Sequence, residues 1–343
     1  MELTKIGLSN ETFYYGFSGK KTTDIVINAK LKSDVNVSAL NKALIYTVMA
    51  YPHLRKKIVV KNGNIYYTDN EENPMVYKWD NNIYRLGTSE TNYFLFRVMY
   101  KRDEIILAIH HGLVDGRGAV KVINMLLSYY VDFNNDSENE SDEILVNDSS
   151  TIKSYIENDE DLYEKFGDVE QEPFYIYKNK GAFVIPEQYY AEDDPTCRKF
   201  KIVCKLNDIL RLAKRSQSTP VPVMSTIISE AIQNVYGKEE KDITAYVPVD
   251  LRNMFNFDTI SNSVIAITLP YSSRLNGKEM DVKCTVLRGI MDLQIQKENF
   301  IYRMGQQVAG SRQRENLEMS AEMKQKIYID RLKKAHVVCI HIC

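Results

Sequence analysis

The sequence has few cysteines and no long apolar run, and each scarcity excludes a class of protein. Its five cysteines are odd in number and form no Cys-x-x-Cys pair, so we expect buried thiols rather than a disulfide framework or a zinc knuckle. No stretch approaches the roughly 20 apolar residues that cross a bilayer. Residues 1–10 also lack the apolar run of a signal peptide. These absences predict a cytoplasmic protein with no membrane partner.

An excess of positive charge is also missing. The formal net charge is -2, and the lysines and arginines are scattered among acidic residues. A nucleic-acid-binding surface needs dense neutralisation of phosphates, so we expect no nucleic-acid partner. With 44% hydrophobic and 26% charged residues, the composition is instead that of an ordinary folded protein.

The length of 343 residues predicts two domains of similar size, which we place at residues 1–180 and 181–343. Apolar periodicity in the first half predicts a sheet with helices between its strands. A polar stretch at 134–148 is too poor in apolar residues to bury a core, which predicts a solvated loop, and a helix is expected from about 151 to 166. The expected strands are 23–31, 57–60, 65–68, 93–100 and 104–110, and the expected helices are 40–48 and 120–130.

The second half repeats this order in outline, which favours an α/β fold throughout. Helical periodicity dominates from about 276 to 334, and a short strand is expected at 336–343. The remaining expected elements are strands at 197–206, 242–249 and 264–269 and helices at 207–215 and 223–235.

The segment His110-His111-Gly112-Leu113-Val114-Asp115-Gly116 is the candidate reaction centre, and it uses two of only five histidines. It follows a nearly all-apolar run and precedes a helical pattern, so it is expected on a strand-to-helix loop. A histidine with an ordinary pKa near 6.5 can accept a proton at neutral pH, and a loop at the end of a buried strand can hold its ring rigidly.

Two other interpretations of this segment stay open. The histidines can satisfy backbone groups in a buried polar loop and do no chemistry. Metal binding by His110, His111 and Asp115 is disfavoured, because adjacent residues at a strand end point in opposite directions, so no metal is expected. His336 and His341 are rival bases, but a terminal strand is a poor place to preorganise one.

The candidate segment resembles the His-His-x-x-x-Asp-Gly signature of the chloramphenicol acetyltransferase superfamily. That superfamily includes nonribosomal peptide condensation domains, carnitine-type acyltransferases and alcohol acetyltransferase-like proteins. Residues 40–55, which end on Tyr-Pro-His-Leu-Arg, resemble the family's first helix and the turn after it. Residues 248–252, Pro-Val-Asp-Leu-Arg, with Asn262 ten residues later, resemble the segment that bears the family's structural arginine.

The resemblance implies an α/β (α+β two-layer) fold with two chloramphenicol acetyltransferase-like lobes. Each lobe would be a mixed sheet flanked by helices, with a cleft or tunnel between the lobes. It implies that His111 is the general base, that His110 supports the loop, and that Asp115 forms a structural ion pair with Arg252. Gly116 would leave room for backbone to approach a substrate or a neighbouring strand.

The implied reaction moves an acyl group from a coenzyme A or carrier-protein phosphopantetheine thioester to a hydroxyl or amine acceptor in a ternary complex. The expected partners are therefore a small-molecule donor and acceptor, or a carrier protein, with no tightly bound cofactor. Backbone N–H groups near Gly116, or Ser261 and Ser263, are candidate oxyanion donors, and Asn262 is a candidate substrate contact.

The chain departs from the family's pattern in one respect. An Asp-Phe-Gly-Trp-Gly-like segment is missing near its C-terminus, because the sole tryptophan is Trp79. The second lobe is therefore expected to be incomplete. This departure supports an alternative function, a noncatalytic condensation-like module that binds or scaffolds a carrier protein or another partner.

Overall fold

The computed structural model describes residues 2–15, 24–82, 84–136, 161–177, 182–184, 202–237, 240–334 and 340–341. The chain divides into two compact units, each built from separated segments. Unit 1 comprises Met1–Asp168, Arg252–Ser263 and Gln306–Ile329, and unit 2 comprises Val169–Leu251, Val264–Gly305 and Asp330–Cys343. The expected domain division at residues 180 and 181 stays a prediction, and unit 1 includes two segments from the second half of the chain.

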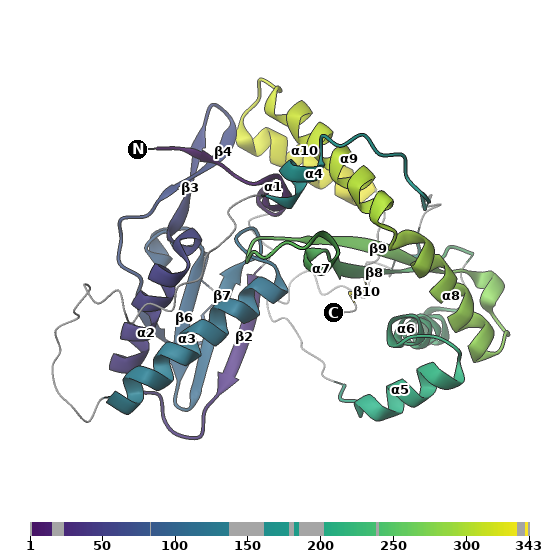
Figure 1. Ribbon diagram of the computed structural model, residues 1–343, viewed down its shortest axis with the longest axis horizontal. Coiled ribbons are helices and arrows are strands. Elements are labelled where there is room, and N and C mark those ends of the chain that lie inside the picture. The colour runs from purple at the N-terminus through teal and green to yellow at the C-terminus, as the bar shows by residue number, and fades with distance from the viewer. Residues whose placement is uncertain are drawn as a thin grey trace. The chain divides into compact units, whose positions relative to one another are not determined.

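The main sheet of unit 1 has the strand order β2-β7-β6-β5. Strands β2, β7 and β6 are antiparallel neighbours, and β5 pairs parallel with β6. Helices α2 and α3 lie side by side on one face of this sheet (Figure 1). The bounds are β2 Asp24–Lys30, α2 Val37–Ala50, β5 Val76–Lys78, β6 Phe96–Lys101, β7 Glu104–His110 and α3 Gly116–Asp136.

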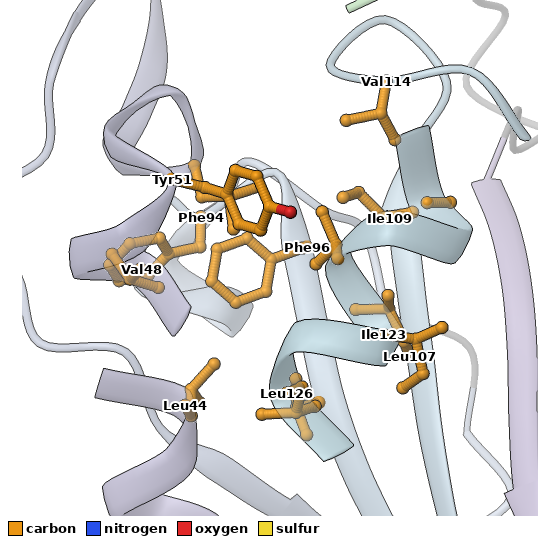
Figure 2. Close-up of a cluster of buried hydrophobic side chains, with 14 of the residues drawn as sticks. Leu44, Val48, Tyr51, Phe94, Phe96, Leu107, Ile109, Val114, Ile123 and Leu126 are labelled. Carbon is orange, nitrogen blue, oxygen red and sulfur yellow. The ribbon is translucent and has the colours of Figure 1, made fainter. Parts of the chain in front are cut away.

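Apolar side chains on one face of the strands fill the space between this sheet and its two helices. Because successive side chains of a strand point to opposite faces, Leu107 and Ile109 of β7 point the same way, toward the helices. Figure 2 shows them with Phe96 of β6, Leu44 of α2 and Leu126 of α3 in one apolar cluster. The opposite face of β7 is also largely buried, as its nearly all-apolar sequence predicts.

A smaller antiparallel sheet of unit 1 has the order β1-β4-β3. The hairpin between β4 and β3 turns at Asn62 and Gly63, whose φ angles are 51° and 72°. A two-residue hairpin turn of type I′ requires positive φ at both of these positions. The other elements of unit 1 are β1 Thr4–Lys5, α1 Leu8–Tyr15, β3 Lys56–Lys61, β4 Asn64–Asp69, α4 Leu162–Phe166 and α7 Arg252–Phe255, with 3-10 turns at Pro52–Arg55 and Ser89–Thr91.

Unit 2 contains a sheet with the order β10-β8-β9, in which β8 and β9 are antiparallel and β10 is parallel to β8. Helices α6 and α8 pack against this sheet and against each other. Its elements are α5 Leu206–Arg215, α6 Pro220–Tyr236, β8 Ile243–Asp250, β9 Val264–Tyr271, a 3-10 turn Ser273–Leu275, α8 Met280–Gln294 and β10 Ile340–His341. Helices α9, Lys297–Glu315, and α10, Ala321–Lys334, each contribute residues to both units.

Most predicted elements are confirmed, and the mixed α/β class is confirmed with them. The strand expected at 197–206 is wrong in its described part, because residues 202–205 form no strand and Leu206 already begins α5. The rest of that strand, most of the loop at 134–148 and the start of the helix at 151–166 lie outside the described residues. Among the helices described, none is long and apolar enough to cross a membrane.

Candidate active site

Asp115 joins the end of the buried strand β7 to the start of helix α3. Its backbone carbonyl accepts the first helical hydrogen bond, from the Ala119 N–H at 2.8 Å. Its carboxylate oxygen Oδ1 accepts from the Gly118 N–H at 2.8 Å. Both contacts are those of a helix N-cap, which satisfies N–H groups that have no partner inside the helix. The motif aspartate therefore fixes where the loop stops and the helix begins.

The same carboxylate forms a two-pronged ion pair with Arg252, within unit 1. Nη1 of Arg252 lies 2.8 Å from Oδ2 of Asp115, and Nη2 lies 3.0 Å from Oδ1. Oδ2 also accepts from the Ser263 N–H at 3.0 Å. The two side chains are 1% and 3% exposed. A buried charge is stable only when it is paired and hydrogen-bonded, and here both requirements are met.

Residues 252–263 fold around the guanidinium of Arg252. Its Nε donates to the Thr259 carbonyl at 2.9 Å, and Nη2 also donates to the Ser261 carbonyl at 2.8 Å. The start of α3 lies directly against this segment. A Cβ atom added at Gly118 would lie 2.0 Å from the Ile260 carbonyl oxygen, so only glycine fits there. Two parts of the chain far apart in sequence are thus locked together beside the motif.

Side chains from three other segments bind the backbone carbonyls of the histidine loop. Nδ2 of Asn262 donates to the His111 carbonyl at 2.7 Å. The Tyr67 hydroxyl donates to the Gly112 carbonyl at 3.0 Å, and Nε2 of His53 donates to the Leu113 carbonyl at 3.1 Å. Three consecutive carbonyls therefore each have a side-chain donor, which fixes the loop backbone without a regular strand or helix.

His110 is a buried ring that holds the loop. Its Nδ1 accepts a hydrogen bond from the Gly112 N–H at 2.9 Å, so that nitrogen carries no proton. Its ring stacks on Tyr14, with the ring centroids 4.8 Å apart. Burial, and to a lesser extent the neighbouring His111, lower the pKa of His110 to about 4. His110 is therefore neutral at physiological pH.

His111 has a different setting. Its side chain is half-buried, and its ring lies parallel to Phe13, with the centroids 4.0 Å apart and the planes within 10°. Phe13 and Tyr14 are neighbours on α1, so one short helix places an aromatic ring against each histidine. The Tyr14 hydroxyl also hydrogen-bonds the Tyr67 hydroxyl at 2.8 Å. Burial raises the pKa of both phenols, so both stay protonated and able to donate.

The structure brings the sequence-predicted residues of the second segment to the loop, where they make backbone contacts. Asn262 is buried and also donates to Oδ1 of Asn10 at 2.6 Å. The Ser263 hydroxyl is buried and donates to the Ser261 carbonyl at 3.4 Å. Gly116 has open space around it, because a Cβ added there would meet no atom within 4 Å. The glycine that permits a close backbone approach is therefore Gly118, two residues further on.

A pocket of about 350 Å³ in unit 1 reaches the first histidine. Its described lining includes His110 and Tyr14 but not His111, and most of its other walls are apolar side chains such as Ile58 and Leu95. No group of three or more His, Cys, Asp or Glu side chains in the described ranges is placed to hold a metal ion.

No family model and no curated protein matches this sequence. Solved structures do match. Polyketide synthase associated protein 5 from Mycobacterium tuberculosis superposes with a TM-score of 0.58 at 14% identity, over 85% of this chain and 74% of that one. TRI101 from F. sporotrichioides, in complex with coenzyme A and T-2, gives 0.54 at 9% identity, over 90% and 78%. The first condensation domain of the calcium-dependent antibiotic synthetase, in complex with a substrate analogue, gives 0.54 at 12% identity, over 95% and 78%.

The chain has the chloramphenicol acetyltransferase-like fold. Condensation domains and acetyltransferases share this fold, as the sequence resemblance predicts. At identities between 9% and 15%, the likeness extends to the fold alone. What this chain does with the fold must be argued from its own residues.

Sequence reasoning missed several residues that shape this site. Phe13, Tyr14 and Tyr67 contact the histidine loop, but their sequence surroundings follow no pattern that marks them. His53 lies in the quoted Tyr-Pro-His-Leu-Arg stretch, where only the turn was predicted and not its bond to Leu113. The run Phe-Tyr-Tyr at 13–15 is dense in aromatic residues, but this density alone does not indicate which segment the rings contact.

Proposed function

We propose that the chain is an acyltransferase that moves an acyl group from a coenzyme A or carrier-protein phosphopantetheine thioester to a hydroxyl or amine. His111 is the general base. The observation that supports this proposal most directly is the division of labour between the two histidines. His110 is buried, neutral and occupied by the Gly112 N–H, whereas His111 is half-buried on a loop whose backbone is bound at three successive carbonyls.

In the proposed reaction one proton is transferred twice, first from the acceptor to His111 and then from His111 to the departing thiolate. His111 takes the proton from the acceptor hydroxyl or amine as its oxygen or nitrogen attacks the thioester carbonyl carbon. The C–S bond then breaks, and the departing thiolate takes the proton back from the imidazolium. The proton balance closes within one ternary complex, so no covalent acyl-enzyme and no tightly bound cofactor is required. A positioned base of this kind contributes about 10²–10⁴-fold in rate.

The negative charge that develops on the carbonyl oxygen needs a donor. We propose the backbone N–H groups at the start of α3 near Gly116, because the positive end of the helix dipole and the open space at that glycine favour an oxyanion there. Ser263 is less suited to this role, because its buried hydroxyl already donates to the Ser261 carbonyl. Asp115 and Arg252 act on the loop and are positioning residues in this scheme.

The test measures thiol release from acetyl-CoA and from acetyl-pantetheine with a panel of alcohols and amines. His111→Ala is expected to lower the rate about 10²–10⁴-fold, because the acceptor keeps its proton. Its thermal unfolding should stay close to that of the wild type, since the His111 ring is only half-buried. His110→Asn is expected to lower the rate less, through a loosened loop.

The matched control is His336→Ala, which removes a rival histidine and should leave thiol release unchanged. Equal rates for the wild type and His111→Ala would contradict the proposal and would favour a binding module with the same fold. If His336→Ala loses activity instead, His336 and not His111 would be the general base.

A further inference from the structure

The face of the main sheet that points away from α2 and α3 carries an unusual set of side chains. The pairing register places Val26, Ala108 and Arg97 in one row across β2, β7 and β6. Asp24 and Met99 lie two residues along their strands from this row, so their side chains point to the same face. Of these five side chains, three are apolar, one is acidic and one is basic.

A pocket of about 200 Å³ opens on this face. It is smaller than the roughly 300–1,000 Å³ of pockets that enclose drug-sized ligands, so it suits a small molecule or one end of a larger one. The sheet forms its floor, and Trp79, Asn82, Tyr84 and Leu86 form its wall. Among the described residues, the lining consists of Asp24, Val26, Trp79, Asn82, Tyr84, Leu86, Arg97, Met99 and Ala108.

Arg97 is the charged centre of this pocket. Its side chain is only 4% exposed, and its guanidinium lies over two aromatic rings, 3.3 Å from the centroid of Tyr84 and 4.3 Å from that of Tyr77. Cation–π contacts of this kind recover part of the cost of burying the charge. They cover the faces of the guanidinium and satisfy none of its N–H donors.

Two nitrogens of Arg97, Nε and Nη1, are buried and have no hydrogen-bond partner in the described part of the chain. A guanidinium has two edges that can hold a carboxylate bidentately, and each edge includes one of these two nitrogens. Arg252 of the same unit shows the contrast, because each of its three guanidinium nitrogens donates a hydrogen bond, to Asp115, Thr259 or Ser261. A buried donor without a partner is costly unless something else binds it.

The polar groups in the wall of the pocket hydrogen-bond to one another. The Tyr84 hydroxyl donates to the Asp80 carboxylate, which also accepts from the backbone N–H and side-chain amide of Asn82. Nε1 of Trp79 donates to Oδ1 of Asn81 at 2.7 Å. The rings of Trp79 and Tyr84 can therefore offer apolar surface to a ligand, while the unused donors are those of Arg97.

We propose that this pocket binds the carboxylate of a small organic acid with an apolar body, with Arg97 as the anchor. A single carboxylate matches the single guanidinium charge and its planar geometry. A phosphate suits the pocket less, since it carries more charge and Asp24, whose Oδ1 is also buried without a partner in the described chain, lines the same cavity. The proposal is independent of the proposed acyl transfer, because it concerns binding and not turnover.

The test is isothermal titration of the full-length protein with benzoate and hexanoate, each compared with its neutral amide, benzamide or hexanamide. Both acids are expected to bind about tenfold or more tightly than their amides, because only the carboxylate accepts charge-assisted bonds from Arg97. Arg97→Gln should weaken binding of the acids by about the same factor. Ala108→Leu, which fills the pocket floor and keeps the charge, should weaken acid and amide alike.

Arg102→Gln is the matched control. It removes an equal charge from the turn after β6, where the Arg102 side chain is 83% exposed, and should leave binding unchanged. If Arg97→Gln fails to fold, the acid–amide comparison on the wild type and the Ala108→Leu variant still decide the matter. Equal binding of acid and amide, tighter binding of inorganic phosphate than of benzoate, no binding of either acid, or unchanged binding in Ala108→Leu would each overturn the proposal.

Discussion

His110 and His111 are adjacent in the chain, yet their rings have different surroundings. One accepts a backbone hydrogen bond and is closed in by Tyr14, and the other lies half-buried against Phe13. The contrast follows from the alternation at a strand end, which turns neighbouring side chains to opposite sides. One ring therefore supports the loop, and the other is the one to which the proposed function assigns proton transfer.

The depressed pKa of His110 makes stability depend on pH. Its pKa is about 4 in the folded chain and 6.5 when unfolded, so below pH 6.5 the unfolded state takes up a proton that the folded state refuses. The His110 contribution is therefore fully present above pH 6.5 and is lost as the pH falls toward 4. The loss is about 3 kcal/mol in the free energy of unfolding.

Asp24 works in the opposite direction, because burial raises its pKa from 3.8 to about 6 and the folded state then binds the extra proton between these values. The test measures urea unfolding of the wild type and of His110→Gln at pH 7 and pH 4. Asp24 is present in both proteins, so its contribution cancels when the two are compared. Relative to His110→Gln, the wild type should lose about 3 kcal/mol between the two pH values. Parallel pH profiles for the two proteins would show that His110 does not titrate differently on folding.

Asp115→Asn tests the buried ion pair at the single-residue level. The amide keeps the shape of the helix cap but leaves the Arg252 charge buried without its partner, which is expected to cost about 3–5 kcal/mol in the free energy of unfolding. Asp69→Asn is the control, because its ion pair with Lys56 is formed by a carboxylate that is 75% exposed. That change should be small, as exposed pairs contribute little. Urea midpoints that shift equally in both variants would contradict the structural role of the pair.

At the scale of elements, the two glycines in the first turn of helix α3 have different surroundings. Gly118 lies against the Ile260 carbonyl, and Gly116 lies in open space. Gly118→Ala should therefore destabilise the chain by about 1–3 kcal/mol through overpacking. Gly116→Ala should leave stability unchanged or slightly raised, since alanine favours a helix. Thermal unfolding of both variants checks this, and equal losses would mean that α3 can shift away from the segment 252–263.

The elements around the site could be read from the sequence because their apolar periods are strong and local. The strand at 104–110 was predicted with the bounds that β7 has. The region before Leu206 was misjudged as a strand, because alternating apolar residues there resemble a strand pattern although 202–205 form none and α5 begins at 206.

The contacts that complete the site could not be read in this way. Tyr67 and His53 reach the loop from 45 and 60 positions away, and nothing in their own surroundings specifies that distance. The pairing of Asp115 with Arg252 was expected only through the family resemblance. Long-range contacts depend on how sheets and helices pack against each other. The apolar periodicity and the secondary-structure propensity of one short stretch do not specify this packing.

At the scale of the whole molecule, unit 1 is built from three separated segments, and helix α9 ties the last of them to the first. Nη2 of Arg314 lies 2.8 Å from Oε2 of Glu11, with side chains only 18% and 14% exposed, and the Ser311 hydroxyl donates to the same carboxylate. Glu11 belongs to α1, the helix that also carries Phe13 and Tyr14. Residues some 200 positions beyond the motif thus help to hold the rings that pack on its histidines.

Arg314→Met should therefore loosen α1 and, through it, the histidine loop. The loss of a largely buried charged hydrogen bond is expected to lower the free energy of unfolding by about 1.5–3 kcal/mol. Amide hydrogen exchange should speed up along α1 while that of α2, whose buried residues belong to the core between the main sheet and its helices, stays unchanged. Arg312→Met is the matched control on the same helix, because its pair with Asp168 is exposed, with side chains 60% and 65% accessible. If both variants exchange alike in α1, the tie between the ends of unit 1 does not stabilise the helix that carries Phe13.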